Sequence, residues 1–274
     1  MLTEDIVGAE TKVGEKVEKA AATPPAYPLF YKEPVVLRRE DHGKLRLMAA
    51  TNYNFARDTN SVLVMAAEFT QAARFYPIVF VGERPLPAVV LGLTTFNVFV
   101  DADGQWDAMR PYKPAYIQRY PFVAVNVAGN SAPSLGIDLA CERLVTEGKA
   151  YKSALPLFAE GKPTQLAERA AKFCSEWNRD FQGTVAFCQA LMDQGLLIDQ
   201  QLAAALPGGK RYNTTGFKSV DMRKFHALPE AVLVEWHRKG FLALVYAHLA
   251  SQLCWNDLAK KMGVQDAAEQ TVQA

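Results

Sequence analysis

Polar side chains that could bind or react are densest in residues 52–60. This stretch reads Asn-Tyr-Asn-Phe-Ala-Arg-Asp-Thr-Asn, and Glu68 follows shortly after it. In a functional interpretation, Arg57 is a fork-shaped donor for a carboxylate or a peptide carbonyl, and its polar neighbours are binding candidates too. In a structural interpretation, Asp58 and Asn60 cap turns while Arg57 pairs with Glu68. The sequence leaves both interpretations open.

A second set of candidates combines aromatic, basic and acidic side chains: Tyr76, Tyr116, Arg119, Tyr120 and Asp138. Tyrosine and arginine often anchor interfaces, whereas aromatic side chains in apolar segments more often belong to a core. A carboxylate near the end of a predicted strand is either a ligand for a partner or an acceptor that serves stability. Both interpretations stay open here as well.

Two of the four histidines, His237 and His248, lie eleven residues apart in a predicted C-terminal helix. Eleven residues is close to three turns, so the rings could share a face, but ~16 Å would separate them along the axis. One metal ion cannot bind both, because each ligand nitrogen must come within ~2.1 Å of it. We expect no metal site. We expect His248 to be buried with a hydrogen-bonded ring; the alternative is a general base in a cleft.

The segment Asp101-Ala102-Asp103-Gly104 resembles the beginning of a calcium loop. An EF-hand loop needs its glycine at position six and a glutamate at position twelve, whereas here the glycine is at position four and Tyr112 is at position twelve. We therefore predict a β-turn between Val100 and Trp106. The chain also lacks G-x-S-x-G, H-E-x-x-H, Walker and G-x-G-x-x-G motifs, so we expect no common cofactor.

Charge and composition indicate a soluble globular protein. Thirty Lys and Arg residues balance twenty-nine Asp and Glu residues, and no extended basic run occurs, which argues against nucleic acid as a partner. The most apolar stretch, residues 241–250, is about half the ~20 residues of a membrane span. The N-terminus lacks a secretory signal and the four cysteines have no short-spaced pair, so we predict a cytoplasmic location.

The first half of the chain is rich in short β-branched and aromatic runs separated by turn residues. The predicted strands are residues 35–37, 61–65, 77–81, 88–93, 97–100, 122–127 and 135–139. Short helices are predicted at residues 66–75 and 115–120, and each leads into a Tyr-Pro step that disfavours further helix. The short links between strands favour a largely antiparallel sheet.

The second half of the chain changes to a helical period. Apolar residues recur at three- and four-residue steps through residues 164–194, and Gly195 follows. A polar, hairpin-like stretch at residues 208–220 precedes a last helix, which opens at Pro229 and is predicted to end near Met262. Because residues 241–249 are apolar on every side, we expect that helix to be buried centrally.

These patterns predict an α+β fold, in which a largely antiparallel mixed sheet in the N-terminal half packs against long C-terminal helices. We predict one domain over residues 28–262, with flexible tails at residues 1–27 and 263–274, which are polar and offer little to bury.

Several ordered segments resemble the SapC family. They include residues 55–60, 66–69, 72–80, 97–101, 114–122, 137–138, 216–217, 220–221, 227–229 and 244–249, and the resemblance extends from about Tyr27 to Leu258. Family members often carry a second acid after the position of Asp138, where this chain has Leu139. The family takes its name from a gene associated with bacterial surface layers, and its members often neighbour genes for outer-membrane receptors. It offers no catalytic residues to carry over.

The resemblance implies an accessory protein that binds a peptide or protein partner in a surface-layer or outer-membrane-uptake system. The alternative is a cofactor-independent enzyme that acts on a peptide or small molecule in a cleft between the sheet and the C-terminal helices, with a carboxylate or His248 as general base. Convergence of the candidate residues in an apolar-walled pocket would favour the enzyme, and an exposed aromatic groove would favour the accessory protein. The oligomeric state is left open.

Overall fold

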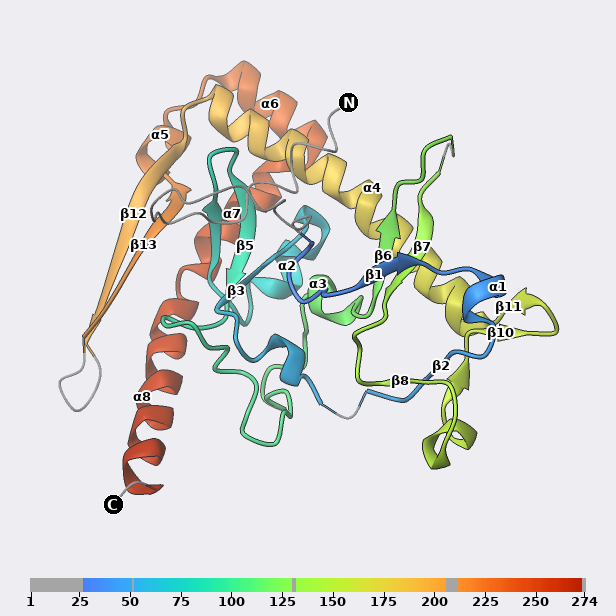
Figure 1. The fold of residues 1–274 in the computed structure, drawn as a ribbon. Coiled ribbons are helices and arrows are strands. Elements are labelled where there is room, and N and C mark those ends of the chain that lie inside the picture. Colours follow the sequence, from blue (N-terminus) through green and yellow to red (C-terminus); the bar gives the residue numbers. More distant parts are fainter. Residues whose placement is uncertain (1–26, 51, 130–131, 206–210, 273–274) are drawn as a thin grey trace, which may run out of the picture. The chain divides into compact units, whose positions relative to one another are not determined.

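The computed structural model describes residues 27–50, 52–129, 132–205 and 211–272 (Figure 1). The contacts within the chain divide it into two compact units, each built from two chain segments. Unit 1 comprises Met1–Met48 and Tyr120–Ala171, and unit 2 comprises Ala49–Arg119 and Lys172–Ala274. Among the described residues, no helix combines the length and the hydropathy that a membrane crossing requires.

Unit 1 is built on short antiparallel strands. One sheet has the order β1-β7-β6, and a second has the order β8-β2-β9. Their bounds are β1 Pro34–Val36, β2 Arg46–Leu47, β6 Phe122–Val125, β7 Ser134–Asp138, β8 Leu144–Val145 and β9 Leu155–Pro156. A two-stranded ribbon of β10 (Phe158–Ala159) and β11 (Lys162–Pro163), the helix α1 (Arg39–His42) and the 3-10 turn η3 (Lys149–Lys152) complete the unit. Ile137 and Leu157 are fully buried in its core.

Unit 2 contains a five-stranded antiparallel sheet with the order β12-β13-β4-β5-β3. The strands are β3 (Ser61–Leu63), β4 (Ile78–Val81), β5 (Leu86–Val90), β12 (Leu197–Ala205) and β13 (Arg211–Val220). The central strands β4 and β5 are apolar and almost entirely buried, whereas β12 forms one edge of the sheet.

The helices of unit 2 hold the sheet and its loops. The short pieces are η1 (Asn54–Ala56), η2 (Ala66–Glu68), α2 (Phe69–Ala72), α3 (Ala115–Gln118) and α5 (Met222–His226). The longer helices are α6 (Glu230–Lys239), α7 (Phe241–Ser251) and α8 (Cys254–Val272), together with α4 (Gln165–Asp193), which begins in unit 1. Helix α7 lies directly on the sheet, because the Ser251 hydroxyl accepts the backbone N–H of Ile78 on β4 at 3.0 Å.

The α+β class is confirmed, as are the long helix at residues 164–194 and most of the predicted strands. The strand predicted at residues 97–100 is wrong. Asn97 instead caps a turn: its side-chain oxygen accepts the N–H of Phe99 at 2.9 Å, and its amide donates to the Ala56 carbonyl at 3.2 Å. Val100 forms an isolated bridge with Trp106, which confirms the β-turn predicted between them.

The single helix predicted from Pro229 to Met262 is also wrong. Gly240 adopts the left-handed conformation, with φ at 75°, and separates α6 from α7. A turn at residues 252–253 separates α7 from α8. Helix α8 continues past Gly263 to Val272, because a glycine inside a helix is tolerated when nothing else stops it. The predicted hairpin-like stretch is strand β13, and its partner β12 was missed because its sequence, LIDQQLAAA, has few β-branched or aromatic residues.

Candidate functional site

The candidates of the 52–60 loop bind neighbouring backbone instead of converging on one point. Arg57 is exposed, and its Nη1 donates to the carbonyl of Ala102 at 3.4 Å. The Asn60 amide donates to the carbonyl of Thr94 at 2.6 Å, and Asp58 is exposed. The predicted pairing of Arg57 with Glu68 is wrong, because three other donors already occupy the Glu68 carboxylate.

Glu68 joins two loops of unit 2 through its carboxylate. Oε1 accepts the N–H of Met65 at 2.8 Å, while Oε2 accepts the N–H of Ala115 at 2.7 Å and the hydroxyl of Tyr112. Burial raises the pKa of Glu68, the three donors oppose that rise, and the charge of Asp180 adds to it. All of the group's hydrogen bonds are made inside the protein, so this carboxylate fixes η2 to the beginning of α3.

Tyr76 continues the same network and is fully buried. Its hydroxyl donates to the carbonyl of Tyr112 at 2.6 Å, and burial raises the pKa of Tyr76 far above its ordinary value. A phenol with a raised pKa and a bound proton is a poor acid or base at neutral pH. Glu68 and Tyr76 therefore hold Tyr112 between them and act as a structural network.

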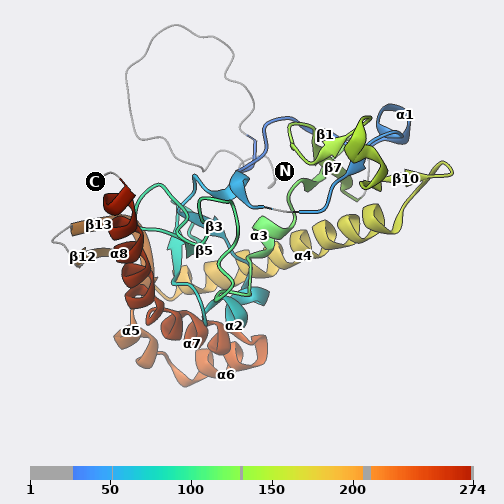
Figure 2. The ribbon, with the colours of Figure 1, turned by 90° about the horizontal axis from the view of Figure 1, so that it is seen from below.

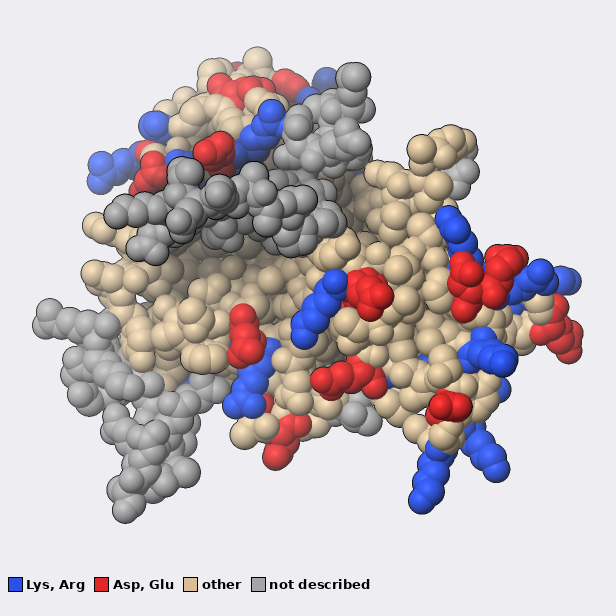
Figure 3. Space-filling view, in the orientation of Figure 1, with Lys and Arg blue, Asp and Glu red and all other residues tan. Residues whose placement is uncertain are grey.

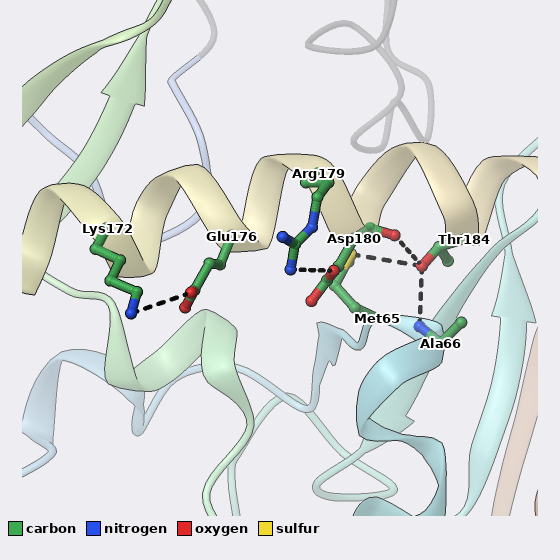
Figure 4. A network of polar contacts seen from close by, with 7 residues as sticks. All are labelled: Met65, Ala66, Lys172, Glu176, Arg179, Asp180 and Thr184. Atoms are coloured by element: carbon green, nitrogen blue, oxygen red, sulfur yellow. Dashed lines mark hydrogen bonds and ion pairs between the residues drawn. The ribbon is translucent and has the colours of Figure 1, made fainter.

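Helix α4 supports this network from one side (Figure 4). The Thr184 hydroxyl donates to the carbonyl of Asp180 at 2.8 Å and accepts the N–H of Ala66, at the beginning of η2, at 2.9 Å. Arg179 pairs with Asp180 at 3.5 Å, and both side chains lie on the same helix (Figure 4). A buried threonine thus supplies a partner for a helix N-terminus that has no side-chain cap of its own.

Tyr116 and Arg119 meet an aromatic residue that the sequence interpretation did not single out, Trp177 on α4. The guanidinium carbon of Arg119 lies 4.1 Å from the ring centroids of both Tyr116 and Trp177. Trp177 in turn stacks on Phe181, with centroids 5.8 Å apart and an angle of 22° between the ring planes. This buried arginine is held by cation–π contacts. The apolar stripe of the helix contained Trp177, but nothing local linked it to Arg119.

Tyr120 and Asp138 form a separate cluster in unit 1. The Asp138 carboxylate, which is fully buried, accepts the N–H of Glu33 at 2.6 Å, the N–H of Lys32 at 3.2 Å and the hydroxyl of Tyr120 at 3.1 Å. Burial raises the pKa of Tyr120, and the neighbouring Cys141 and Asp138 raise it further. The cluster ties the segment before β1 to the end of β7.

His248 is fully buried on α7 with its ring against Phe80, at 5.1 Å between ring centroids. Its Nε2 accepts the backbone N–H of Val220 at 3.1 Å, which confirms the predicted buried, hydrogen-bonded histidine. Burial lowers the pKa of His248 to about 4, so the ring is neutral at pH 7 and carries its proton on Nδ1. His237 lies apart on α6 and is exposed. In the described part of the chain, no three His, Cys, Asp or Glu side chains are grouped to bind a metal.

The candidates therefore occupy five places: the 52–60 loop, the Glu68–Tyr112–Tyr76 network, the Arg119 stack, the Asp138 cluster and the His248 contact. The cleft that the enzyme alternative places between the sheet and the C-terminal helices is filled at α7, where Ile78, Phe80, Val245, His248 and Ser251 are all fully buried. The aromatic residues Tyr116, Tyr120 and Phe122 are buried as well, so they cannot form an exposed binding surface. Within unit 2, this geometry disfavours a shared catalytic pocket.

A further exposed feature of unit 2 is the β12–β13 hairpin, in which the sequence analysis missed strand β12. Within the described residues, β12 pairs only with β13, and β13 pairs with β4 only through Phe217 and Lys218. The paired residues 202–205 and 211–214 therefore extend beyond the sheet as an arm (Figure 1). Gly216, with φ at 83°, lies at a register shift in this hairpin.

The charges on one face of the molecule do not form a field of one sign. On the face that Figure 3 shows, the described Lys and Arg side chains are interspersed with Asp and Glu. A site for a phosphate backbone would present a continuous basic stripe. The absence of nucleic acid among the partners stays a prediction.

Comparison with protein families gives one match: the SapC family model matches residues 37–258. This range covers most of the chain and includes strands and helices of both units. Searches of curated proteins and of solved structures find no match.

Proposed function

Because the chain belongs to the SapC family, we propose that it is an accessory protein that binds a peptide or protein partner in a bacterial surface-layer or outer-membrane-uptake system. The association of the family's name with surface layers supports the setting. The observation that carries the binding function is the outer edge of β12, with which no strand pairs among the described residues except β13 on its other side.

An edge strand presents a row of backbone N–H and C=O groups that can pair with another strand. Proteins usually protect such edges with proline, lysine, bulges or very short strands. Strand β12 has nine residues and contains neither proline nor lysine, and the extra residue at the register shift of the hairpin lies on β13. Its one charged residue, Asp199, binds Lys218 of β13 with 2.6 Å between Oδ1 and Nζ, which offsets its charge. An edge of this kind suits an extended peptide that adds a further strand.

The polar candidates support the same conclusion, because their side chains already bind the protein's own backbone. Glu68 and Asp138 bind backbone N–H groups, and the ring of His248 accepts another. Strand addition needs none of these groups, because the backbone itself supplies the hydrogen bonds. The proposed activity is thus recognition without covalent chemistry, and its affinity depends on the hairpin.

A shortened hairpin tests the proposal. Gln200 and Phe217 are register partners, so replacing residues 201–216 with Asn-Gly closes a two-residue turn at that pair and removes the arm. Both proteins are immobilised and exposed to a native bacterial lysate, and the captured proteins are quantified by mass spectrometry. We expect a surface-layer or outer-membrane protein at near-stoichiometric amounts on the full-length chain only. Equal capture by both proteins, or no stoichiometric capture by either, would contradict the proposal.

A matched control keeps the backbone edge and changes exposed side chains. Gln201 and Asn213 are exposed, one on each strand of the hairpin. The double variant Gln201→Ser, Asn213→Ser should capture the same partner in the same amount, because strand addition is directed by main-chain groups. Loss of capture in this variant would show that side chains, not the edge, recognise the partner. Circular dichroism on all three proteins checks that the fold is intact.

A further inference from the structure

Helix α7 is mostly apolar around its circumference, yet one of its sides is exposed. Val245, His248 and Ser251 are fully buried toward the sheet. On the opposite side, Ala243, Tyr246 and Ala250 are exposed, and so is Leu253, which follows the C-cap residue Gln252. Tyr246 is 56% exposed and Leu253 is 76% exposed. We call these four residues, Ala243, Tyr246, Ala250 and Leu253, the α7 seam.

A helix with one free face ordinarily carries charged or polar residues on it. The α7 seam carries none: its one polar atom is the hydroxyl of Tyr246. More apolar surface lies beside it on α5, where Met222 is 53% exposed. The ring of Tyr246 packs against the buried Phe225 of the same helix, with 5.5 Å between the ring centroids. Figure 2 shows α5, α6 and α7 together along one border of unit 2. An exposed apolar surface of this kind marks an interaction site.

The spacing of the seam fits a second helix. Its residues follow one another at steps of three, four and three, which is the spacing of the a and d positions in a helix pair. Small and large side chains alternate along it. Two helices can therefore approach closely at each alanine, provided that a large side chain of the partner fills the space above it.

The alternation of small and large side chains along the α7 seam indicates which partner helix fits it. In an antiparallel pair centred at position 248, Tyr246 of one chain lies opposite Ala250 of the other, and Ala243 lies opposite Leu253. Each large side chain then meets a small one, and the same contacts occur twice, as a two-fold interface requires. A parallel pair would place Tyr246 against Tyr246 and Leu253 against Leu253, and would leave the alanines facing each other across a gap.

We propose that a second copy of this chain docks on the α7 seam, with the two α7 helices antiparallel. The seam carries no charge, so like charges do not oppose each other across the two-fold axis. The helix has eleven residues and is about 16 Å long, which is too short to bury the ~800 Å² per partner of a standard interface. The dimer is therefore weak and depends on concentration.

Sedimentation velocity on the full-length chain tests this, at concentrations from about 5 to about 200 µM. We expect the sedimentation coefficient of the wild-type protein to rise with concentration. Leu253→Glu should weaken the association at least about tenfold, because it buries a carboxylate against Ala243 of the other copy. Met109 is 81% exposed on a loop, so Met109→Glu is the matched control and should associate as the wild type does.

Disulfide trapping tests the register. A mixture of the Tyr246→Cys and Ala250→Cys variants should give a cross-linked heterodimer under mild oxidation, whereas Leu253→Cys alone should not cross-link, because its two copies lie far apart in the antiparallel pair. The native cysteines are buried and do not compete. A wild-type protein that stays monomeric throughout, a dimer that Leu253→Glu leaves unchanged, or cross-linking of Leu253→Cys alone would overturn the proposal. The shortened hairpin should leave the dimer intact, so the two proposals fail independently.

Discussion

The imidazole of His248 accepts the backbone N–H of Val220, with 3.1 Å between Nε2 and the amide nitrogen. This bond links the middle of α7 to the end of β13 in the interior of unit 2, where His248 has no solvent exposure. The ring must be neutral to accept the bond, so protonation removes it and leaves a charge in an apolar site.

Acid should therefore destabilise the protein through His248. Burial lowers the pKa of His248 from 6.5 to about 4, so between these values the unfolded chain binds the proton more readily. The free energy of unfolding then falls as the pH drops from 6.5 toward 4, by about 3 kcal/mol in total, and this contribution is fully present above pH 6.5. Urea denaturation at a series of pH values measures it.

His248→Gln removes the titrating ring and keeps an acceptor for the Val220 N–H. We expect it to lose this part of the pH dependence. His237→Gln, on the exposed surface of α6, should leave the pH dependence as it is in the wild type. If the free energy of unfolding changes with pH in His248→Gln as it does in the wild type, the assignment to His248 is wrong.

Among the polar residues of unit 1, Asp138 should be the one whose replacement lowers the free energy of unfolding most. Its carboxylate accepts the backbone N–H groups of Lys32 and Glu33, and Asp138→Ala leaves both donors and the Tyr120 hydroxyl without this acceptor. We expect a loss of about 3 kcal/mol in unfolding free energy. Tyr120→Phe removes one of the three bonds and should cost about 1 kcal/mol.

Hydrogen exchange separates this local effect from a general one. The amides of Lys32 and Glu33 should lose protection in Asp138→Ala and keep it in Tyr120→Phe. Unchanged protection of both amides in Asp138→Ala would refute the assignment of this carboxylate as their acceptor.

Replacement of two glycines by alanine should change the stability of the protein in opposite directions. Gly216 in the hairpin has φ at 83°, so a side chain there is strained although nothing lies near it, and Gly216→Ala should cost about 1 kcal/mol. Gly183 lies inside α4, also with nothing near an added Cβ, and Gly183→Ala should stabilise by about 1 kcal/mol. Thermal unfolding measures both, and a shift of the same sign in both variants would contradict the argument.

The predicted single domain of residues 28–262 stays a prediction. Its physical basis is α4, which runs unbroken from Gln165 to Asp193 through the boundary between the two units at residues 171–172. We expect one cooperative thermal transition, and limited proteolysis should release no independently folded part. Two separate transitions, or a stable fragment that keeps its own circular dichroism spectrum, would show that the units fold independently.

Local patterns predicted the elements well where each residue's own preference decided the outcome. The apolar stripe at residues 164–194 gave α4, and the β-branched runs gave β1, β4 and β6. The Tyr-Pro steps at residues 76–77 and 120–121 correctly placed the ends of α2 and α3 before them. Strand β12 forms because it pairs with β13, so the preferences of its own residues did not predict it.

The sequence by itself determined the family, the α+β class, the buried His248 and the absence of common catalytic motifs, because these depend on residue types and on short-range spacing. Only the tertiary structure decided what the polar candidates do, because Asp138 meets Lys32 and Arg119 meets Trp177 across long stretches of chain. The tertiary structure also decided which apolar side chains are exposed to solvent. Both sides of α7 carry apolar residues, and the position of the sheet decides that Val245 is buried and Tyr246 is exposed.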